Sequence, residues 1–222
     1  MSRINIFAGH YGSGKTEIAI NYAFKLREQG KNVTLVDLDI VNPYFCSREL
    51  KELLESKGIK LISSDPSLSN AELMVVPAEV LSVFNDKDSE VIFDIGGDEV
   101  GAVALGRYNS YFKEENYEMF FVINNKRPLT NTSVEAETYL KQIQKASRLK
   151  VSGIISNTNL SYETSIEDIV NGEKEAIKLS NKLNIPIKFT VVRKDLKQSA
   201  QGILKSNILP INIYIKPFWR EN

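Results

Sequence analysis

Short apolar runs alternate along the chain with segments in which apolar residues recur at helical spacing. The runs lie at Ile4–Ala8, Val33–Leu38, Ile59–Ile62, Val91–Ile95, Met119–Ile123, Val151–Ser156 and Ile187–Val192. Between the first two runs, apolar residues from Ile18 to Leu26 fall on one helical face. This alternation is typical of repeated βαβ units. It predicts a three-layer α/β fold with a mostly parallel central sheet of about seven or eight strands flanked by helices.

Three further features of the pattern concern its later part and its continuity. The tail Ile208–Ile215, beside Pro210 and Pro217, predicts an edge strand. Asn171-Gly172 interrupts a helical pattern and predicts a short helix followed by a longer one from about Glu173. Because no linker, internal repeat or shift in composition divides the chain, we expect residues 1–222 to form a single domain.

Composition and charge narrow the class of protein. The 222 residues are 42% hydrophobic and 25% charged, as in globular chains, and 28 Lys and Arg balance 28 Asp and Glu. This balance does not favour a nucleic-acid partner. No apolar run reaches the roughly 18 residues of a membrane span, and no signal-type segment precedes the first run, so we expect a cytoplasmic protein without a membrane partner. The single Cys46 is interpreted as a small buried apolar residue.

The segment 8-AGHYGSGKTEIA-19 carries a phosphate-binding signature. Gly9-x4-Gly14-Lys15-Thr16 has the P-loop pattern and lies between a predicted strand and a predicted helix, as that motif requires. The glycines let successive backbone N–H groups turn toward phosphate oxygens at the helix N-terminus. We expect Lys15 to reach the β- and γ-phosphates and the Thr16 hydroxyl to bind Mg²⁺. The nucleotide-binding residues predicted in this loop are Gly9, Gly12, Ser13, Gly14, Lys15 and Thr16.

Three aspartates follow two of the apolar runs. Asp37 and Asp39 end the second run, and Asp94 lies near the end of the fourth. Ligands of open α/β sheets bind at the carboxyl ends of the strands, so these carboxylates are expected beside the phosphates. Asp94 has the position of a Walker-B residue, and with Asp37 and Thr16 it forms the predicted Mg²⁺ site. Gly97 follows, where a backbone without a side chain can approach a terminal phosphate. The alternative for each aspartate is a helix cap or a loop residue.

With these residues, the chain resembles the MinD/ParA (CobQ/CobB/MinD/ParA nucleotide-binding) group of P-loop NTPases. The class also holds signal-recognition GTPases and dethiobiotin synthetase. The resemblance rests on the loop at Gly9–Thr16, on VDLD, on FDIGG and on 151-VSGIISNTN-159. It implies that Asp39 positions or activates the attacking water, which with Lys15 makes the catalytic pair. It also implies that Asp94 acts on Mg²⁺ through water, and that Asn157 contacts adenine. The alternative for Asn157 is an ordinary turn residue at a strand end.

The loop departs from that group at one position. Members usually carry a second, signature lysine in the pattern Lys-Gly-Gly-x-Gly-Lys-Thr, and the matching stretch here begins His10-Tyr11. In the group this lysine crosses a nucleotide-sandwich dimer and stabilises charge on the partner's phosphates, as an arginine finger does. Because an unperturbed imidazole is mostly neutral at pH 7, His10 either lies near the phosphates or shapes the loop. We therefore expect slow intrinsic turnover, accelerated by a self-dimer or another protein.

Nucleotide identity follows from the end of the sixth run. GTPases read guanine with Asn/Thr-Lys-x-Asp, and the corresponding Asn157-Thr158-Asn159-Leu160 lacks the acid. An amide suits the donor and acceptor of adenine, which predicts ATP.

Two other segments complete the picture of the ligand edge. The glycine-rich stretch from Gly97 to Gly106 is interpreted as a loop that senses the γ-phosphate and moves. Arg127 is expected either to contact phosphate or a partner, or to be solvated.

Three classes of function fit these motifs. The first is a Mg²⁺-dependent ATPase that acts slowly as a nucleotide-dependent switch or accessory factor, with ATP and ADP as ligands and an unknown protein partner or a nucleotide-dependent homodimer. The second is a small-molecule kinase or ATP-dependent ligase, for which Asn42–Phe45 is the candidate acceptor wall. The third is an ATP-binding module without physiological turnover.

Overall fold

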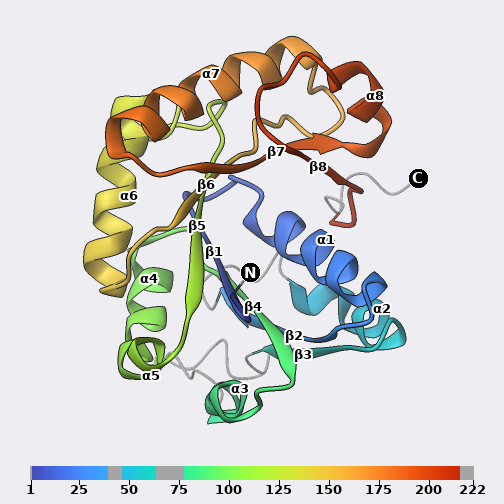
Figure 1. Ribbon diagram of the computed structural model, residues 1–222, viewed down its shortest axis with the longest axis vertical. Helices are drawn as coiled ribbons and strands as arrows, with labels where there is room; N and C mark the ends of the chain where they lie inside the picture. The colour runs from blue at the N-terminus through green and yellow to red at the C-terminus, as the bar shows by residue number, and fades with distance from the viewer. Residues whose placement is uncertain (1, 40–46, 64–77, 216–222) are drawn as a thin grey trace.

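The apolar runs of the sequence form the strands of one parallel sheet. The computed structural model describes residues 2–39, 47–63 and 78–215 (Figure 1). Its strands are β1 (Ile4–Ala8), β2 (Asn32–Leu38), β3 (Ile59–Ser63), β4 (Ser89–Ile95), β5 (Tyr117–Ile123), β6 (Gly153–Ser156), β7 (Ile187–Arg193) and β8 (Ile208–Ile211). They are ordered β3-β2-β4-β1-β5-β6-β7-β8, and the pairings are parallel. The predicted parallel sheet is confirmed.

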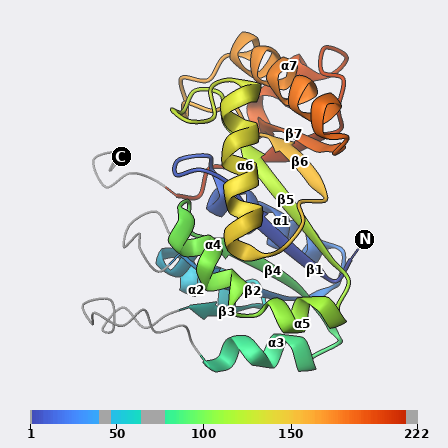
Figure 2. The ribbon, with the colours of Figure 1, turned by 90° about the vertical axis from the view of Figure 1, so that its left-hand side faces the viewer.

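Helices cover both faces of this sheet. They are α1 (Lys15–Glu28), α2 (Lys51–Ser56), α3 (Ser82–Asn85), α4 (Glu99–Gly106), α5 (Asn109–Glu114), α6 (Ser133–Ser147), α7 (Ile166–Leu183) and α8 (Lys197–Ala200). Helices α1 and α2 pack on one face, whereas α3 to α7 contribute to the core on the other (Figure 1). Figure 2 shows α4 and α6 side by side on that second face. The predicted three-layer arrangement is confirmed.

Aromatic side chains fill both cores. On the α1 face the ring of Phe7 lies 5.5 Å from the rings of Tyr22 and Phe120. On the opposite face Phe112 makes edge contacts with Phe84 and Phe93, at 5.1 and 5.5 Å. Because the strands are covered on both faces, they are almost continuously apolar. Polar side chains are therefore found mainly at the strand ends, where the site forms.

Helix α7 is continuous, so the predicted break at Asn171-Gly172 is wrong. The helix begins with a capping box in which Asp168 N donates to Ser165 Oγ at 3.1 Å, and it ends at Leu183. A Cβ atom at Gly172 would collide with the side chain of Thr158 in the loop after β6. Gly172 is small because the helix approaches that loop closely, and not because the helix ends there.

The glycine-rich segment after Asp94 is also ordered differently from the expectation. Residues 99–106 form helix α4 instead of a loop, and Asp98 caps it by accepting from Gly101 N at 2.9 Å. A Cβ at Gly101 would lie 2.6 Å from the carbonyl oxygen of Gly96. The glycine at this position lets the first turn of the helix pack against the strand end.

Strand β8 lies at the edge of the sheet, as predicted, but it ends at Ile211 and not at Ile215. Beyond that point Asn212 N donates to Asn21 Oδ1 of helix α1 at 2.9 Å, and Asn212 O accepts from Asn21 Nδ2 at 2.9 Å. The backbone leaves the strand ladder because side chains of α1 take over its hydrogen bonds.

Two features of the sequence fall outside the described residues, namely Cys46 and the candidate acceptor wall Asn42–Phe45. In the part of the chain that the structure describes, no helix has the length and apolar character needed to cross a membrane.

Candidate functional site

The P-loop forms a tight turn between β1 and α1. Gly12 and Gly14 have φ angles of 71° and 84°, in the left-handed region that favours glycine. A Cβ at Gly14 would also collide with the amide of Asn157. Within the loop Ser13 N donates to His10 O at 3.1 Å, while Ser13 Oγ is buried and has no hydrogen-bond partner among the described residues. Helix α1 begins at Lys15, so the positive end of its dipole faces this turn.

Lys15 is buried beneath the loop. Only 6% of its surface is exposed, and its Nζ donates to His10 O at 3.2 Å. Burial lowers the pKa of Lys15, while the charges of Asp94, Asp39 and Asp98 act in the opposite direction. A cation in this position is held at the inside of an anion-binding turn.

The structure brings the three predicted aspartates to one edge of the sheet. Strands β2 and β4 are adjacent, and Asp37 is in register with Asp94. The carboxylate of Asp37 accepts from Asp39 N at 2.9 Å, so it also orders the end of its own strand. The carboxylate of Asp39 faces the backbone after β4, where a Cβ at Gly96 would lie 3.2 Å from Asp39 Oδ1. All three carboxylates are nearly inaccessible to solvent.

Asp94 is the most deeply buried of the three carboxylates. Its Oδ2 accepts from Ser47 Oγ at 3.3 Å, the Thr16 side chain also hydrogen-bonds it, and its Oδ1 is buried without a partner among the described residues. Burial, reinforced by the charge of Asp37, raises the pKa of Asp94 to about 8, although Lys15 and Thr16 act against this rise. Within the described residues no three His, Cys, Asp or Glu side chains are grouped as a metal site. Mg²⁺ in nucleotide sites is held by one or two protein oxygens, directly or through water, together with phosphates, and the oxygens of Thr16, Asp37 and Asp94 are of the kind that it takes.

Gly97 lies against the P-loop. A Cβ at this position would lie 2.6 Å from Tyr11 N and 3.0 Å from Lys15 Nζ, so there is room only for glycine. Its carbonyl accepts a hydrogen bond of 2.6 Å from the hydroxyl of Tyr139 in α6. Nothing in the local sequence around Tyr139 signals this contact, because the two residues are 42 positions apart.

Asn157, at the end of β6, lies beneath the P-loop. It is 2% exposed, and its Nδ2 donates to Ser13 O at 2.6 Å. The amide thus fixes the loop to the neighbouring strand, and the residue also lines the cavity described below. Its contact with adenine stays a prediction.

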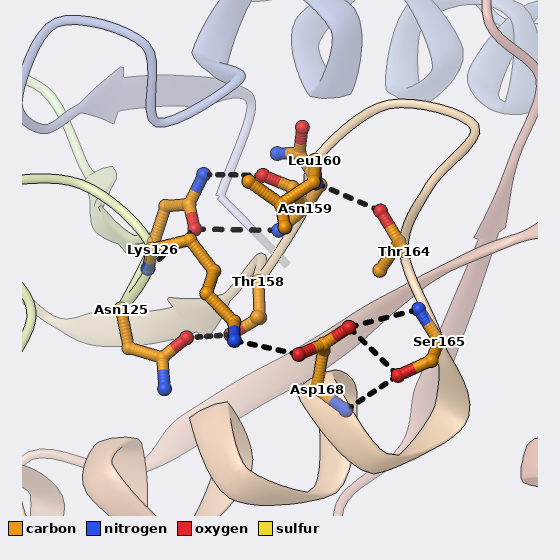
Figure 3. Close-up of polar contacts among 9 residues, drawn as sticks. Asn125, Lys126, Thr158, Asn159, Leu160, Thr164, Ser165 and Asp168 are labelled. Atoms are coloured by element: carbon orange, nitrogen blue, oxygen red, sulfur yellow. Dashed lines mark hydrogen bonds and ion pairs between the residues drawn. The ribbon is translucent and has the colours of Figure 1, made fainter.

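The loops after β5 and β6 are joined beside the P-loop. Figure 3 shows the polar network between these loops and the first turn of α7, in which Thr158 Oγ1 donates to Asn125 Oδ1 at 2.9 Å and Lys126 pairs with Asp168 at 2.6 Å. Asn124, which follows β5, donates from Nδ2 to Gly12 O at 3.3 Å and to Asn159 O at 3.0 Å. Asn124 therefore links the loop after β5 to the P-loop and to the loop after β6, a role that the sequence alone does not reveal.

Arg127 belongs to the same loop cluster. Its Nε donates to Gly12 O at 3.2 Å, and the side chain is otherwise exposed at the edge of the cavity. No carboxylate pairs with it within the described residues. The arginine therefore contacts the outer side of the phosphate-binding turn.

A cavity of about 570 Å³ opens next to these groups. Its lining includes residues of the P-loop and the first turn of α1, together with Asp39. It also includes the loop after β6 and apolar side chains, namely Ile169, Val191, Leu196, Ile211, Ile213 and Ile215. A lining that combines anion-binding groups with apolar side chains suits a ligand with a phosphate group and a flat, less polar moiety.

The last part of this wall is tied to helix α1. Glu17, one residue after Thr16, accepts from Tyr214 N at 2.7 Å and from Ile215 N at 3.1 Å. Burial raises the pKa of Glu17 to about 7, and these two hydrogen bonds act against the rise. The segment 212–215 contributes Ile213 and Ile215 to the cavity wall, and side chains of α1 hold it there.

Comparison with known proteins agrees with this geometry. A family model described as the CobQ/CobB/MinD/ParA nucleotide binding domain matches residues 4–171. No curated protein is significantly similar in sequence.

Solved structures of FtsY share the fold. The cell division protein FtsY of Thermotoga maritima is 21% identical with a TM-score of 0.60, over 85% of this chain and 61% of that one. Chloroplast FtsY of Physcomitrella patens is 14% identical with a TM-score of 0.59, over 86% and 58%. The signal recognition particle receptor FtsY of Elizabethkingia anophelis, in complex with GDP, is 17% identical with a TM-score of 0.52, over 86% and 57%. The chain thus spans roughly three fifths of each FtsY structure, and this likeness concerns the fold alone.

Proposed function

The chain belongs to the CobQ/CobB/MinD/ParA nucleotide-binding domain family of P-loop proteins, and on that premise we propose that it binds Mg²⁺-ATP and hydrolyses it slowly. In this proposal it acts in the cytoplasm as a nucleotide-dependent switch or accessory factor for a partner protein. One observation carries the proposal: residues of the P-loop line one cavity of about 570 Å³ together with Asp39, and the Thr16 side chain in that lining hydrogen-bonds the buried Asp94.

Each of these charged and polar groups has a task in the proposed reaction. Lys15 neutralises charge on the β- and γ-phosphates, where a preorganised cation is most effective because water is excluded. Asp39 orients the attacking water by accepting its hydrogen bond. Thr16, Asp94 and Asp37 would hold Mg²⁺, which supplies charge neutralisation at the phosphates.

The choice of ATP rests on the residues after β6. The stretch Asn157 to Leu160 offers amides and a hydroxyl and no carboxylate, which suits adenine better than guanine. A carboxylate from further along the same loop, Glu163, also lines the cavity, and one of the FtsY structures contains GDP. GTP is therefore the competing ligand that the test must include.

The switch role rests on the surface around the cavity. Tyr11 of the P-loop and Leu160 of the loop after β6 line the cavity and are 58% and 36% exposed. Exposed apolar side chains next to a ligand site favour contact with a partner protein or a second copy of the chain. With His10 in place of the signature lysine, acceleration of turnover requires a group that such a partner supplies.

The proposal is tested by calorimetry with Mg²⁺-ATP and Mg²⁺-GTP on the parent and on Lys15→Ala. We expect tighter binding of ATP than of GTP by the parent, and a loss of at least about tenfold in ATP affinity in the variant, because charge-assisted contacts are removed. Lys145→Ala, which removes an exposed lysine of α6 remote from the site, is the charge-matched control. Unchanged ATP binding in Lys15→Ala would contradict the assignment of the loop, and tighter GTP binding would overturn the choice of nucleotide.

A further inference from the structure

We infer that Tyr139 of helix α6 is a positioning residue that holds Gly97 toward the terminal phosphate, and that His10 keeps the tyrosine ring in place. The inference rests on the proposed function and adds a residue to that site.

The backbone at Gly97 lies between two parts of the molecule. On one side a Cβ would lie 2.6 Å from Tyr11 N and 3.0 Å from Lys15 Nζ, so this face of the residue is in contact with the phosphate-binding turn. From the other part, the Tyr139 hydroxyl donates to Gly97 O at 2.6 Å. The position of Gly97 relative to the phosphates is therefore fixed by a hydrogen bond from α6.

Tyr139 is suited to this task because its hydroxyl remains a donor. The side chain is half-buried against the core of the α6 face. Burial, together with the charge of Asp98, raises the pKa of Tyr139 to about 12. The phenol stays protonated at any physiological pH, so its hydrogen bond to the carbonyl does not depend on titration.

His10 completes the arrangement through its ring. The ring lies 5.0 Å from that of Tyr139 in an edge-to-face orientation, with an interplanar angle of 77°. Its Nδ1 lies 2.9 Å from Tyr11 O. Burial lowers the pKa of His10 and the charges of Lys15 and Arg127 add to this effect, although the hydrogen bond with the Tyr11 backbone acts against it. A neutral imidazole packed edge-to-face on a tyrosine is an aromatic contact, which accounts for an aromatic ring and not a cation at residue 10.

This arrangement links the nucleotide to the outer surface of the protein. Gly97 lies two residues after the end of β4, whereas Tyr139 lies in the helix whose first turn exposes Val134. A terminal phosphate that contacts the backbone at Gly97 is therefore coupled to α6 through the hydrogen bond from the Tyr139 hydroxyl. Because ADP lacks that phosphate, the hydrogen bond should matter for ATP and not for ADP.

The decisive variant is Tyr139→Phe, which removes only the hydroxyl. Affinities for ATP and ADP are measured by calorimetry, and single-turnover hydrolysis is measured alongside. We expect ATP affinity to fall about 3- to 10-fold, the range of one neutral hydrogen bond, with ADP affinity unchanged within twofold and the single-turnover rate of hydrolysis lowered. Tyr117→Phe is the matched control, because its hydroxyl accepts from Lys150 N at 3.0 Å, away from the site. An unchanged ratio of ATP to ADP affinity in Tyr139→Phe, in a variant that melts like the control, would overturn the inference.

Substitutions at His10 separate a ring contact from a charge. His10→Phe retains an aromatic ring against Tyr139 and should preserve the ratio of ATP affinity to ADP affinity. His10→Lys should lower this ratio about as much as Tyr139→Phe does. The reverse order would overturn the role given to His10. If the parent binds ATP and ADP equally, the inference fails while the nucleotide site stands. If the parent binds neither ATP nor ADP, the proposed function itself fails, and Lys15→Ala cannot lower a binding that is absent.

Discussion

Lys15, Asp39 and Asp94 are ionisable side chains that are buried together at the carboxyl edge of the sheet. Removing charges from water costs several kcal/mol per ion unless partners compensate. Here the compensation is incomplete, since Asp94 Oδ1 has no hydrogen-bond partner among the described residues and the pKa of Asp94 is raised to about 8. A phosphate ligand and its cation would supply the missing partners of these residues. Buried groups with perturbed pKa values of this kind cluster at functional sites.

Asp39→Ala should retain ATP but lose hydrolysis. A carboxylate that orients water acts on the transition state more than on the bound ground state, so we expect kcat to fall about 100-fold or more with little change in ATP affinity. Phosphate release and calorimetry measure the two quantities. Asp88→Ala, at an exposed turn before β4, is the control. Equal hydrolysis by Asp39→Ala and the parent would remove Asp39 from catalysis.

Asp168 offers a test of the loop network by pH. Its hydrogen bonds with Lys126 and Ser165 hold the pKa of Asp168 at about 2. Because this folded-state pKa lies below the unfolded value of about 3.9, the group contributes stability above about pH 4, and the contribution is lost as the pH falls towards 2. NMR titration of the Asp168 carboxyl should show the low pKa, and Lys126→Met should raise it. A pKa unchanged by Lys126→Met would mean that the ion pair is not formed in solution.

The residues of the site differ in whether their roles depend on neighbours in the sequence or on contacts with distant residues. The P-loop and the three aspartates could be predicted because each motif occupies consecutive positions beside a strand. Tyr139 and Asn124 could not, because their contacts with Gly97 and Gly12 join positions 42 and 112 residues apart. Glu17 shows a third case, since an acid in the first turn of a helix has an ordinary explanation and its role in holding residues 214–215 depends on the fold.

Among the elements, α7 shows how packing overrides local preference. Glycine is the poorer helix former, yet Gly172 lies in the middle of an 18-residue helix. Gly172 allows α7 to approach Thr158 closely, and this contact positions the loop after β6 that lines the cavity.

Gly172→Ala should therefore destabilise the protein although alanine favours helices. The added methyl group collides with Thr158, and overpacking of this kind costs about 1–3 kcal/mol. Chemical denaturation measures the loss. The neighbouring exposed position provides the control, because Asn171→Ala should leave stability unchanged or raise it slightly. Greater stability of Gly172→Ala would contradict the close approach.

The elements that the sequence predicted least well share this cause. Glycines at 101 and 172 were interpreted as signs of flexibility or of a helix end, but both allow close contact between elements. Strand β8 ends early because Asn21, far away in the sequence, replaces its ladder partner. The sheet itself was predictable, since buried parallel strands need apolar residues over their whole length.

For the whole molecule, the decisive question is association. If a second copy supplies the accelerating group, Asp39→Ala with trapped ATP should shift from monomer to dimer, because a ligand drives association only through different affinities for the two states. Light scattering with ATP, with ADP and without nucleotide measures the mass. The same mass in all three conditions would argue against a nucleotide-dependent homodimer and in favour of a different protein partner. Rapid turnover by a proven monomer would contradict the proposal of slow intrinsic hydrolysis.

The tie between the P-loop helix and residues 212–215 spans 191 to 198 positions of the chain. During synthesis the phosphate-binding turn leaves the ribosome early, whereas the wall formed by Ile211, Ile213 and Ile215 leaves it late. The wall of the cavity can be complete only after these late residues have left the ribosome and docked on helix α1. The order of synthesis therefore makes this wall one of the last parts of the cavity to be assembled.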